Sequence, residues 1–106
     1  MIDLDNLKFD DKGLIPAVVH EVGSNKILMV AYMNRQSLEI TLEEKRTCFF
    51  SRSRQKLWRK GETSGHIQKV KEIWADCDFD CLQIIVEQIG PACHTNKHSC
   101  FFNQIV

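Results

Sequence analysis

Residues 14–33 read LIPAVVHEVGSNKILMVAYM, two apolar segments on either side of a short polar interval. The segment 14–21 is rich in β-branched residues, and the segment 26–33 is mostly apolar, a composition typical of strands. The Gly-Ser-Asn interval at 23–25 is a turn signal. We therefore predict two strands, 14–21 and 26–33, that pair as a hairpin.

A single helix is predicted directly after this hairpin. Asn34 is a typical helix N-cap, and the residues that follow, 35–45, suit a helix. Leu38 and Leu42 lie four positions apart on one face of it, while glutamates keep the remaining surface polar. We expect the helix to pack through the leucine face.

The rest of the chain favours short strands. Strand patterns occur at 47–51, 67–74, 79–89 and 100–106, which brings the predicted total to about six strands and one helix. The connections between them are too short for repeated crossover helices. The sequence thus predicts an α+β fold, a mostly antiparallel β-sheet with one main helix, in a single domain of residues 1–106.

Charge and cysteine content limit the function classes. Lys and Arg number 14, as do Asp and Glu, so no net charge favours nucleic acid or a membrane surface as a partner. Residues 1–10 lack the basic start and apolar run of a signal peptide, and no apolar stretch reaches the ~20 residues of a membrane span. We expect a cytoplasmic protein.

In that compartment five cysteines point to metal binding or catalysis and not to disulfides.

Three carboxylates alternate in the DCDFD segment. In an extended chain, Asp76, Asp78 and Asp80 would share one face and repel, and a divalent cation such as Mg²⁺, Ca²⁺ or Mn²⁺ would relieve that repulsion. Glu87 completes the spacing of an EF-hand loop, but Cys81 replaces the required glycine and the loop would run through a predicted strand. We reject the EF-hand; a solvated acidic strand end is the alternative to a metal site.

Thiols supply a second candidate metal site. Cys93 and Cys100 lie seven residues apart, and with Cys77 they would give three thiolates and one open position, as catalytic zinc sites have. Sharing between two chains would be reasonable if one chain cannot bring all three together. Buried thiols without metal are the alternative. Cys48 fits the core, and Cys81 fits either the core or a further ligand position.

Imidazoles and a basic segment accompany these groups. His94 and His98 lie between the two thiols and suit a ligand or an acid–base role, and His66 follows a glycine-rich turn. Residues 52–60 hold five cations and one tryptophan, which suits phosphate binding and base stacking, with further donors at 61–65. Surface imidazoles, a solvated charged strand and a core tryptophan are the alternatives. The candidate substrate-binding residues are Arg52, Arg54, Trp58, Lys60, Thr63 and Ser64.

The segment SRSRQKLWRKGETSGH at 51–66 resembles a signature block of the phosphoribosyl-AMP cyclohydrolase family. So do DCDFD at 76–80, ACHT at 92–95 and SCF at 99–101, and AYMN at 31–34 also fits. These blocks cover nearly the whole chain in the expected order. The family usually has glycine where this chain has Asn96, and asparagine tolerates the positive φ that such a glycine adopts.

The resemblance implies an enzyme of histidine biosynthesis that hydrolytically opens the adenine ring of phosphoribosyl-AMP, a phosphorylated nucleotide, between N1 and C6. It implies zinc-activated water attack at C6, for which His94 is our choice as proton carrier, with His66 as a second candidate. It also implies an intertwined homodimer whose zinc sites use cysteines of both chains. The implied ligands are Cys77, Cys93 and Cys100 for zinc, and Asp76, Asp78 and Asp80 for magnesium.

Two other functions compete with this hypothesis. A zinc-dependent purine deaminase would also attack C6, but its His-x-Glu and Pro-Cys-x-x-Cys pattern is absent from the sequence. A zinc module that binds single-stranded nucleic acid through Trp58 and the basic segment would need no turnover. Neutral net charge argues against the second.

Overall fold

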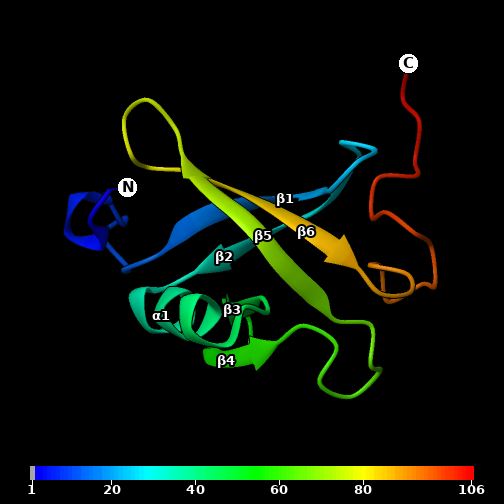
Figure 1. Cartoon of the computed structure of the whole chain (residues 1–106), viewed down its shortest axis with the longest axis horizontal. Helices are drawn as coiled ribbons and strands as arrows, with labels where there is room; N and C mark the ends of the chain where they lie inside the picture. Colours follow the sequence, from blue (N-terminus) through cyan, green and yellow to red (C-terminus); the bar gives the residue numbers. More distant parts are fainter. Residues whose placement is uncertain (1) are drawn as a thin grey trace.

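The computed structural model describes residues 2–106, and they form six strands, one α-helix and a short 3₁₀ turn (Figure 1). The predicted α+β class is therefore confirmed. No helix among these residues is both long and apolar enough to cross a membrane. The elements are η1 Leu4–Asn6, β1 Ile15–Glu21, β2 Ile27–Met33, α1 Arg35–Glu44, β3 Cys48–Ser51, β4 Lys56–Arg59, β5 Gln68–Ala75 and β6 Leu82–Gln88.

Four of the strands form one sheet in the order β2-β1-β6-β5. The β1–β2 hairpin is antiparallel, as predicted, and so is the β5–β6 pair. The two central strands, β1 and β6, are parallel although they are far apart in the sequence, with Ala17 opposite Leu82 and Glu21 opposite Val86. The strands β3 and β4 form a separate antiparallel pair. The expectation of a mostly antiparallel arrangement holds, with this one central exception.

The helix begins where the sequence predicts and turns a different face to the core. Asn34 and Ser37 cap its first turn reciprocally, each side chain bonding the other's backbone N–H. The buried positions are Ser37, Leu38 and Thr41, whereas Leu42 is exposed, so the predicted leucine face is only half right. A hydrogen bond explains this difference, because the Thr41 hydroxyl accepts the Cys48 N–H at 2.9 Å and so holds the Thr41 face of the helix against β3.

Three boundaries differ from the predictions. Residues 100–106 form no strand, because Cys100 N–H bonds Leu28 carbonyl at the edge of β2 and the residues beyond it stay exposed. Residues 56–59 of the basic segment do form a strand, β4, because β3 offers it a partner. The strand predicted at 79–89 begins at Leu82 and not at residue 79, since the preceding residues belong to a turn.

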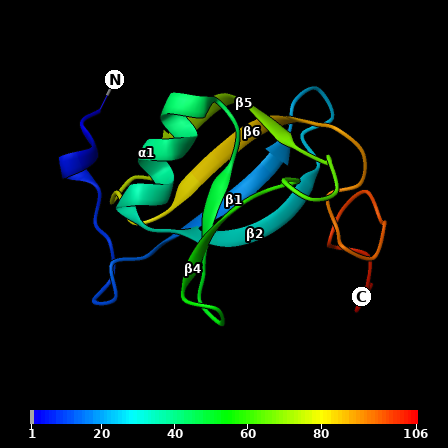
Figure 2. The ribbon, with the colours of Figure 1, turned by 90° about the horizontal axis from the view of Figure 1, so that it is seen from below.

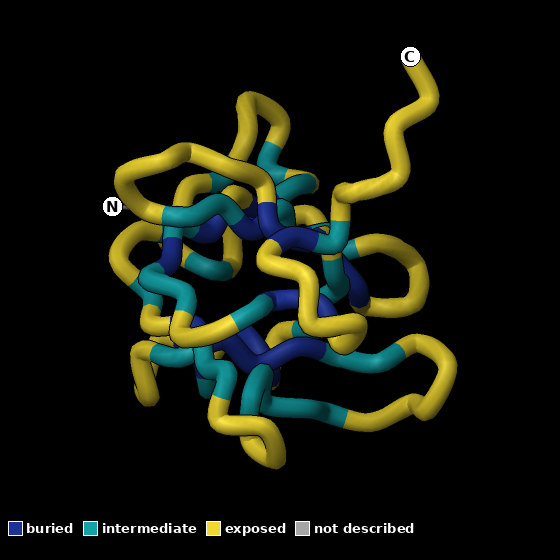
Figure 3. Tube along the Cα trace, turned by 90° about the vertical axis from the view of Figure 1, so that its right-hand side faces the viewer, coloured by how far each residue is buried: buried dark blue, intermediate teal, exposed yellow. Residues whose placement is uncertain are grey.

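The hydrophobic core lies between one face of the large sheet and the α1 and β3–β4 elements. It joins inward residues of β1 and β6, such as Val19 and Ile84, to Leu38 of α1 and Phe49 of β3. Figure 2 shows α1 and the β4 hairpin crossing in front of and beside the sheet strands. Figure 3 shows the exposed positions mainly in the loops and the C-terminal segment.

Candidate active site and metal centres

A cleft of about 630 Å³ opens between the segment that follows β4 and the segment that follows β6. Figure 1 shows these two segments, green and orange, on the same side of the molecule. The cleft brings together most of the side chains that the sequence analysis selected for substrate and proton transfer. Those that line it are Arg54, Trp58, Lys60, Thr63, Ser64, His66, Cys93 and His94.

Trp58 and Lys60 join the walls of this cleft. The Trp58 ring is half-buried and packs on Phe49, with ring centroids 5.1 Å apart, so it belongs partly to the core and partly to the cleft. The Lys60 ammonium lies 5.5 Å from the Trp58 ring centroid and donates a hydrogen bond to the Ala92 carbonyl on the opposite wall. Burial lowers the pKa of Lys60, and the neighbouring Cys100 and Cys93 oppose that shift.

Arg52 lies outside the cleft. Its guanidinium carbon stands 4.0 Å from the centre of the Tyr32 ring, a cation–π contact. Together with Lys12 it lines a smaller cavity of about 240 Å³. The structure thus separates Arg52 from Arg54, which the sequence analysis had grouped together.

Two of the three candidate zinc ligands meet in one loop. Hydrogen bonds from Thr95, whose hydroxyl lies 3.0 Å from the Cys93 sulfur, lower the pKa of Cys93, and Cys100 contributes a further bond. Burial raises the pKa of the Cys100 thiol. The loop turns tightly at Asn96, where φ is +68°, so the predicted tolerance of asparagine for positive φ is confirmed in place. Two neighbouring cysteine side chains are a donor pair that suits zinc.

Cys77 lies elsewhere. It is exposed, in the turn that precedes β6, whereas Cys93 follows β6. Seven residues of strand span about 20 Å. Figure 1 shows the two segments at opposite ends of β6. A single chain therefore does not bring the three thiols together, and within residues 2–106 the acidic triad is the one group of three potential metal ligands whose ligand atoms meet.

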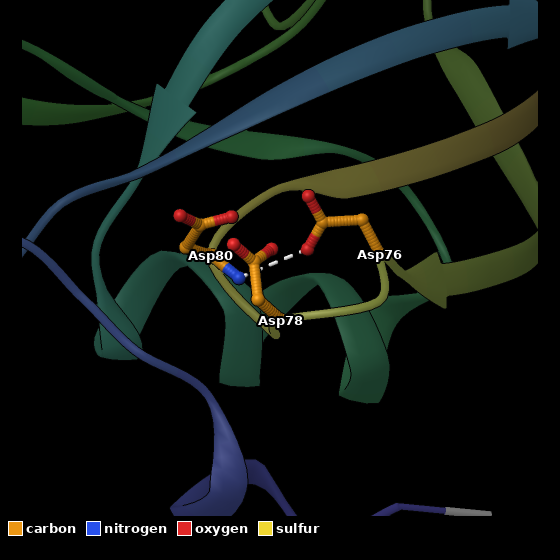
Figure 4. Close-up of side chains that lie close together, drawn as sticks. All are labelled: Asp76, Asp78 and Asp80. Atoms are coloured by element: carbon orange, nitrogen blue, oxygen red, sulfur yellow. Dashed lines mark hydrogen bonds between the residues drawn. The ribbon is translucent and has the colours of Figure 1, made fainter.

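The acidic triad forms on a turn and not on the extended strand that the sequence analysis assumed. Oδ1 of Asp76 accepts the N–H groups of Asp80, at 3.0 Å, and Cys81, at 3.2 Å. Phe79 adopts φ +66° and packs against the core, which folds the turn back on itself. The three carboxylates still converge, with candidate ligand oxygens all within 4.8 Å of one another (Figure 4).

Crowding in the triad perturbs its titration. The hydrogen bond with Asp78 and the charges of both neighbours raise the pKa of Asp80. Partial desolvation acts to raise the pKa of Asp76, but hydrogen bonds from Asp80 and the Cys81 N–H outweigh it and leave the pKa lowered. An all-oxygen set of this kind fits a hard divalent cation, which would neutralise the repulsion.

The histidines occupy different surroundings. His94 is exposed at the cleft, and His66 is half-buried in its wall. His98 is not part of the cleft lining; its Nε2 lies 2.9 Å from a carboxylate oxygen of Glu21. Hydrogen bonds from Ser24 and then His98 lower the pKa of Glu21. The Glu21 contact was missed by sequence reasoning, since no local pattern joins residues that are so far apart.

Comparison with known sequences agrees with this site. A sequence model of the family described as phosphoribosyl-AMP cyclohydrolase matches residues 29–102. The chain belongs to the phosphoribosyl-AMP cyclohydrolase family. The match spans the cleft, the acidic triad and both thiol segments, and it favours the cyclohydrolase hypothesis over the deaminase and the nucleic-acid module.

Individual relatives support the assignment. A phosphoribosyl-AMP cyclohydrolase of Methanosarcina barkeri is 59% identical over 105 residues, covering 99% of this chain and 81% of that protein. One of Bacillus cereus is 55% identical over 95 residues, covering 90% of this chain and 94% of the relative. A histidine biosynthesis bifunctional protein HisIE of Caldanaerobacter subterraneus subsp. tengcongensis is 61% identical over 102 residues, 96% of this chain. The chain spans about half the length of the bifunctional relatives, 50% and 49% for two of them.

Gly90 is a further residue beside the cleft, and from the sequence it is predicted only as part of a turn. Its φ is +71°, and a Cβ there would stand 2.6 Å from Cδ2 of His66. The imidazole of His66 therefore rests directly on the Gly90 backbone. A glycine in a turn is an ordinary sequence feature, and the contact becomes visible only in three dimensions.

We expect Gly90→Ala to displace the His66 ring. Gly23→Ala is the matched control, because Gly23 has φ +87° with no atom within 4 Å of its added Cβ. Both variants should lose about 1–2 kcal/mol of unfolding free energy, because alanine is strained in the left-handed backbone conformation that each glycine adopts. Urea denaturation measures this loss. Only Gly90→Ala should also shift the imidazole NMR resonances of His66. Unchanged resonances in a folded Gly90→Ala variant would contradict the contact.

Proposed function

We propose that this chain hydrolytically opens the adenine ring of phosphoribosyl-AMP between N1 and C6, a step of histidine biosynthesis. The observation that carries the proposal is the meeting of Cys93, two imidazoles and a cationic wall in one cleft, with Cys100 hydrogen-bonded to Cys93. The names and identities of the relatives agree with it. A cytoplasmic location, and the absence of nucleic-acid and membrane partners, stay predictions.

The cleft walls suit a phosphorylated purine. The half-buried Trp58 offers a ring face for base stacking. Arg54 and Lys60 supply positive charge, and Thr63 and Ser64 supply hydroxyl donors for a phosphate. We assign substrate binding to these side chains. Arg52 stays a weaker candidate, because its guanidinium rests on Tyr32 outside the cleft.

We propose that Cys93 and Cys100 hold zinc together with Cys77 of a second copy of the chain. The paired thiols at the cleft fit that metal, and the remoteness of Cys77 within one chain explains why a second copy is needed. When bound, zinc supplies the Lewis acidity that lowers the pKa of a bound water to about 7. Mg²⁺ is proposed for the carboxylates of Asp76, Asp78 and Asp80, where it would neutralise charge.

The imidazoles move the protons in this proposal. The ribosyl substituent on N1 gives the ring amidinium character and makes C6 electrophilic. His94 accepts the proton of the attacking water as oxygen bonds to C6, and a protonated imidazole then donates to N1. The N1–C6 bond then breaks with N1 protonated, and C6 becomes a carboxamide as its hydroxyl proton passes to the imidazole that has just donated its own or to solvent. His66, set in the wall of the same cleft, is the alternative donor.

A homodimer is proposed to cover the outer face of the four-stranded sheet. This face carries exposed apolar side chains, including Val30 on β2 and Trp74 on β5, which are 48% and 57% exposed. A two-fold axis would set each β6 against its copy, and could bring the turn of one chain to the thiol loop of the other. The intertwined arrangement that the resemblance implies needs such a contact.

Ring opening is the first test of the function. Purified protein supplied with phosphoribosyl-AMP should change its ultraviolet absorbance as the adenine ring opens. Removal of metal by a chelator should abolish the change, and zinc together with Mg²⁺ should restore it. No ring opening by folded, metal-loaded protein would rule out the proposed reaction.

His94→Ala tests the proton carrier. We expect kcat to fall by roughly 10²–10⁴ with bound zinc unchanged, if His94 serves as general acid or base. His98→Ala is the control from the same loop, because His98 bonds Glu21 away from the cleft. It should leave kcat nearly unchanged. Equal losses in the two variants would point to loop damage and remove His94 from the mechanism.

Trp74→Glu tests the dimer. A charge on the outer sheet face should lower the dimer fraction in sedimentation, and the amount of zinc bound per chain should fall with it, because each site needs two copies. Leu42→Glu is the control, an exposed leucine on α1. It should change neither quantity. A monomeric variant that keeps its full zinc content would contradict the shared site.

A further inference from the structure

A glutamine lies fully buried beneath the cleft. Gln68, the first residue of β5, has no exposed surface, and its amide nitrogen lies 3.4 Å from the sulfur of Met29. A buried carboxamide destabilises the fold unless both its ends are hydrogen-bonded. Both ends of the Gln68 amide have a hydrogen-bond partner, and the two partners lie on opposite sides of it.

The partners form a chain of hydrogen bonds with one sense. The Thr47 hydroxyl donates to Oε1 of Gln68 at 2.8 Å, and Nε2 of Gln68 donates to Oε1 of Gln88 at 2.8 Å. Because Oε1 of Gln68 accepts from Thr47 and Oε1 of Gln88 accepts from Gln68, the orientation of each glutamine amide is fixed. The Nε2 group of Gln88 is thereby left to donate onward.

The far end of this chain reaches the wall that carries His66. Nε2 of Gln88 lies 3.5 Å from the His66 carbonyl and 3.3 Å from the Ile89 carbonyl. Ile89 N–H also donates to the Ile67 carbonyl at 3.0 Å. Gln88 therefore ties the backbone of His66 to the backbone just before Gly90, the residue on which the His66 ring rests.

The near end reaches the wall that carries Lys60. The backbone of Thr47 accepts the Lys60 N–H at 3.1 Å and donates to the Gln68 carbonyl at 3.2 Å. The intervening segment, residues 61–65, has positive φ at both of its glycines and little buried surface. These hydrogen bonds, buried at Thr47 and Gln68, thus link two residues that an exposed loop joins in sequence.

We propose that Gln68 is a positioning residue, which through Thr47 and Gln88 sets the orientation of His66 and the spacing between His66 and Lys60 across the cleft. Its consequence for turnover rests on the proposed function, in which these two residues act on one substrate. The effect on the position of His66 does not depend on the proposed function, because that position is measurable without substrate. An apolar side chain at 68 would fill the same space and leave the orientation of Gln88 unset.

Thr47→Val removes the first donor while keeping the shape of the side chain. We expect the imidazole resonances of His66, assigned with a His66→Gln variant, to shift in the metal-loaded enzyme. We also expect kcat to fall by about tenfold to a hundredfold through misplacement of reacting groups, with a smaller change in KM. Thr47→Ser keeps the hydroxyl and should restore both quantities.

Thr41→Val is the matched control. The Thr41 hydroxyl is also buried and bonds the Ser37 carbonyl and the Cys48 N–H, so its loss destabilises the same region without touching the chain to His66. It should lower the unfolding midpoint and leave the His66 resonances and kcat unchanged. If Thr41→Val moved His66 as far as Thr47→Val, general loosening would explain both and overturn the proposal.

Gln88→Met provides a second variant, because Gln88 is half-buried and its replacement is less of a threat to folding. It breaks the last link and should reproduce the His66 shift. Unchanged His66 resonances in folded Thr47→Val or Gln88→Met protein would overturn the positioning role. A wild-type protein without ring opening would overturn the proposed function alone, since the resonance shift would still test the chain.

Discussion

The parallel pairing of β1 with β6 is the contact on which the rest of the structure depends. It joins the N-terminal hairpin to the C-terminal hairpin and makes β1 and β6 the two central strands of the sheet, with Val19 and Ile84 fully enclosed. Closing so long a loop costs conformational entropy, which the burial of apolar surface on these strands offsets. The pairing also positions β6, whose two ends are flanked by the candidate metal ligands.

The length of β6 explains why the candidate metal ligands are divided between two places. The acidic triad and Cys77 precede the strand, and the Cys93–Cys100 loop follows it, so a straight strand holds them about 20 Å apart. Adjacent positions in the sequence thus become distant positions in space. A symmetric pair of chains is a simple way to reunite them, and the exposed apolar sheet face is a surface through which such a pair could form.

Features with local causes could be predicted from the sequence, and features with distant causes could not. The hairpin, the Asn34 cap and the positive φ at Asn96 depend on a few neighbouring residues. The strand at 56–59 was missed because it forms only by pairing with β3. Residues 100–106 form no strand despite their pattern, because beyond the contact of Cys100 with the edge of β2 they stay exposed. The candidate site followed the same rule. Its residue types were identified, but the separation of Arg52 from the cleft and of Cys77 from the other thiols depends on the fold.

The two glycine contacts at His66 and the buried Gln68 show why composition alone could not locate the working parts of the cleft. A Cβ at Gly61 would lie 2.5 Å from the His66 carbonyl carbon, and one at Gly90 would meet its ring, so backbone enters the space on two sides of this residue. The contact at Gly61 restricts the His66 backbone and the contact at Gly90 restricts its ring, a restriction that suits the proton-transfer role proposed for His66. The loop that carries His66 is itself exposed and glycine-rich, so contacts with the buried residues below it have to hold it in place. A buried amide with both ends bonded supplies that order, because either rotation of the amide would leave a buried polar atom without a partner.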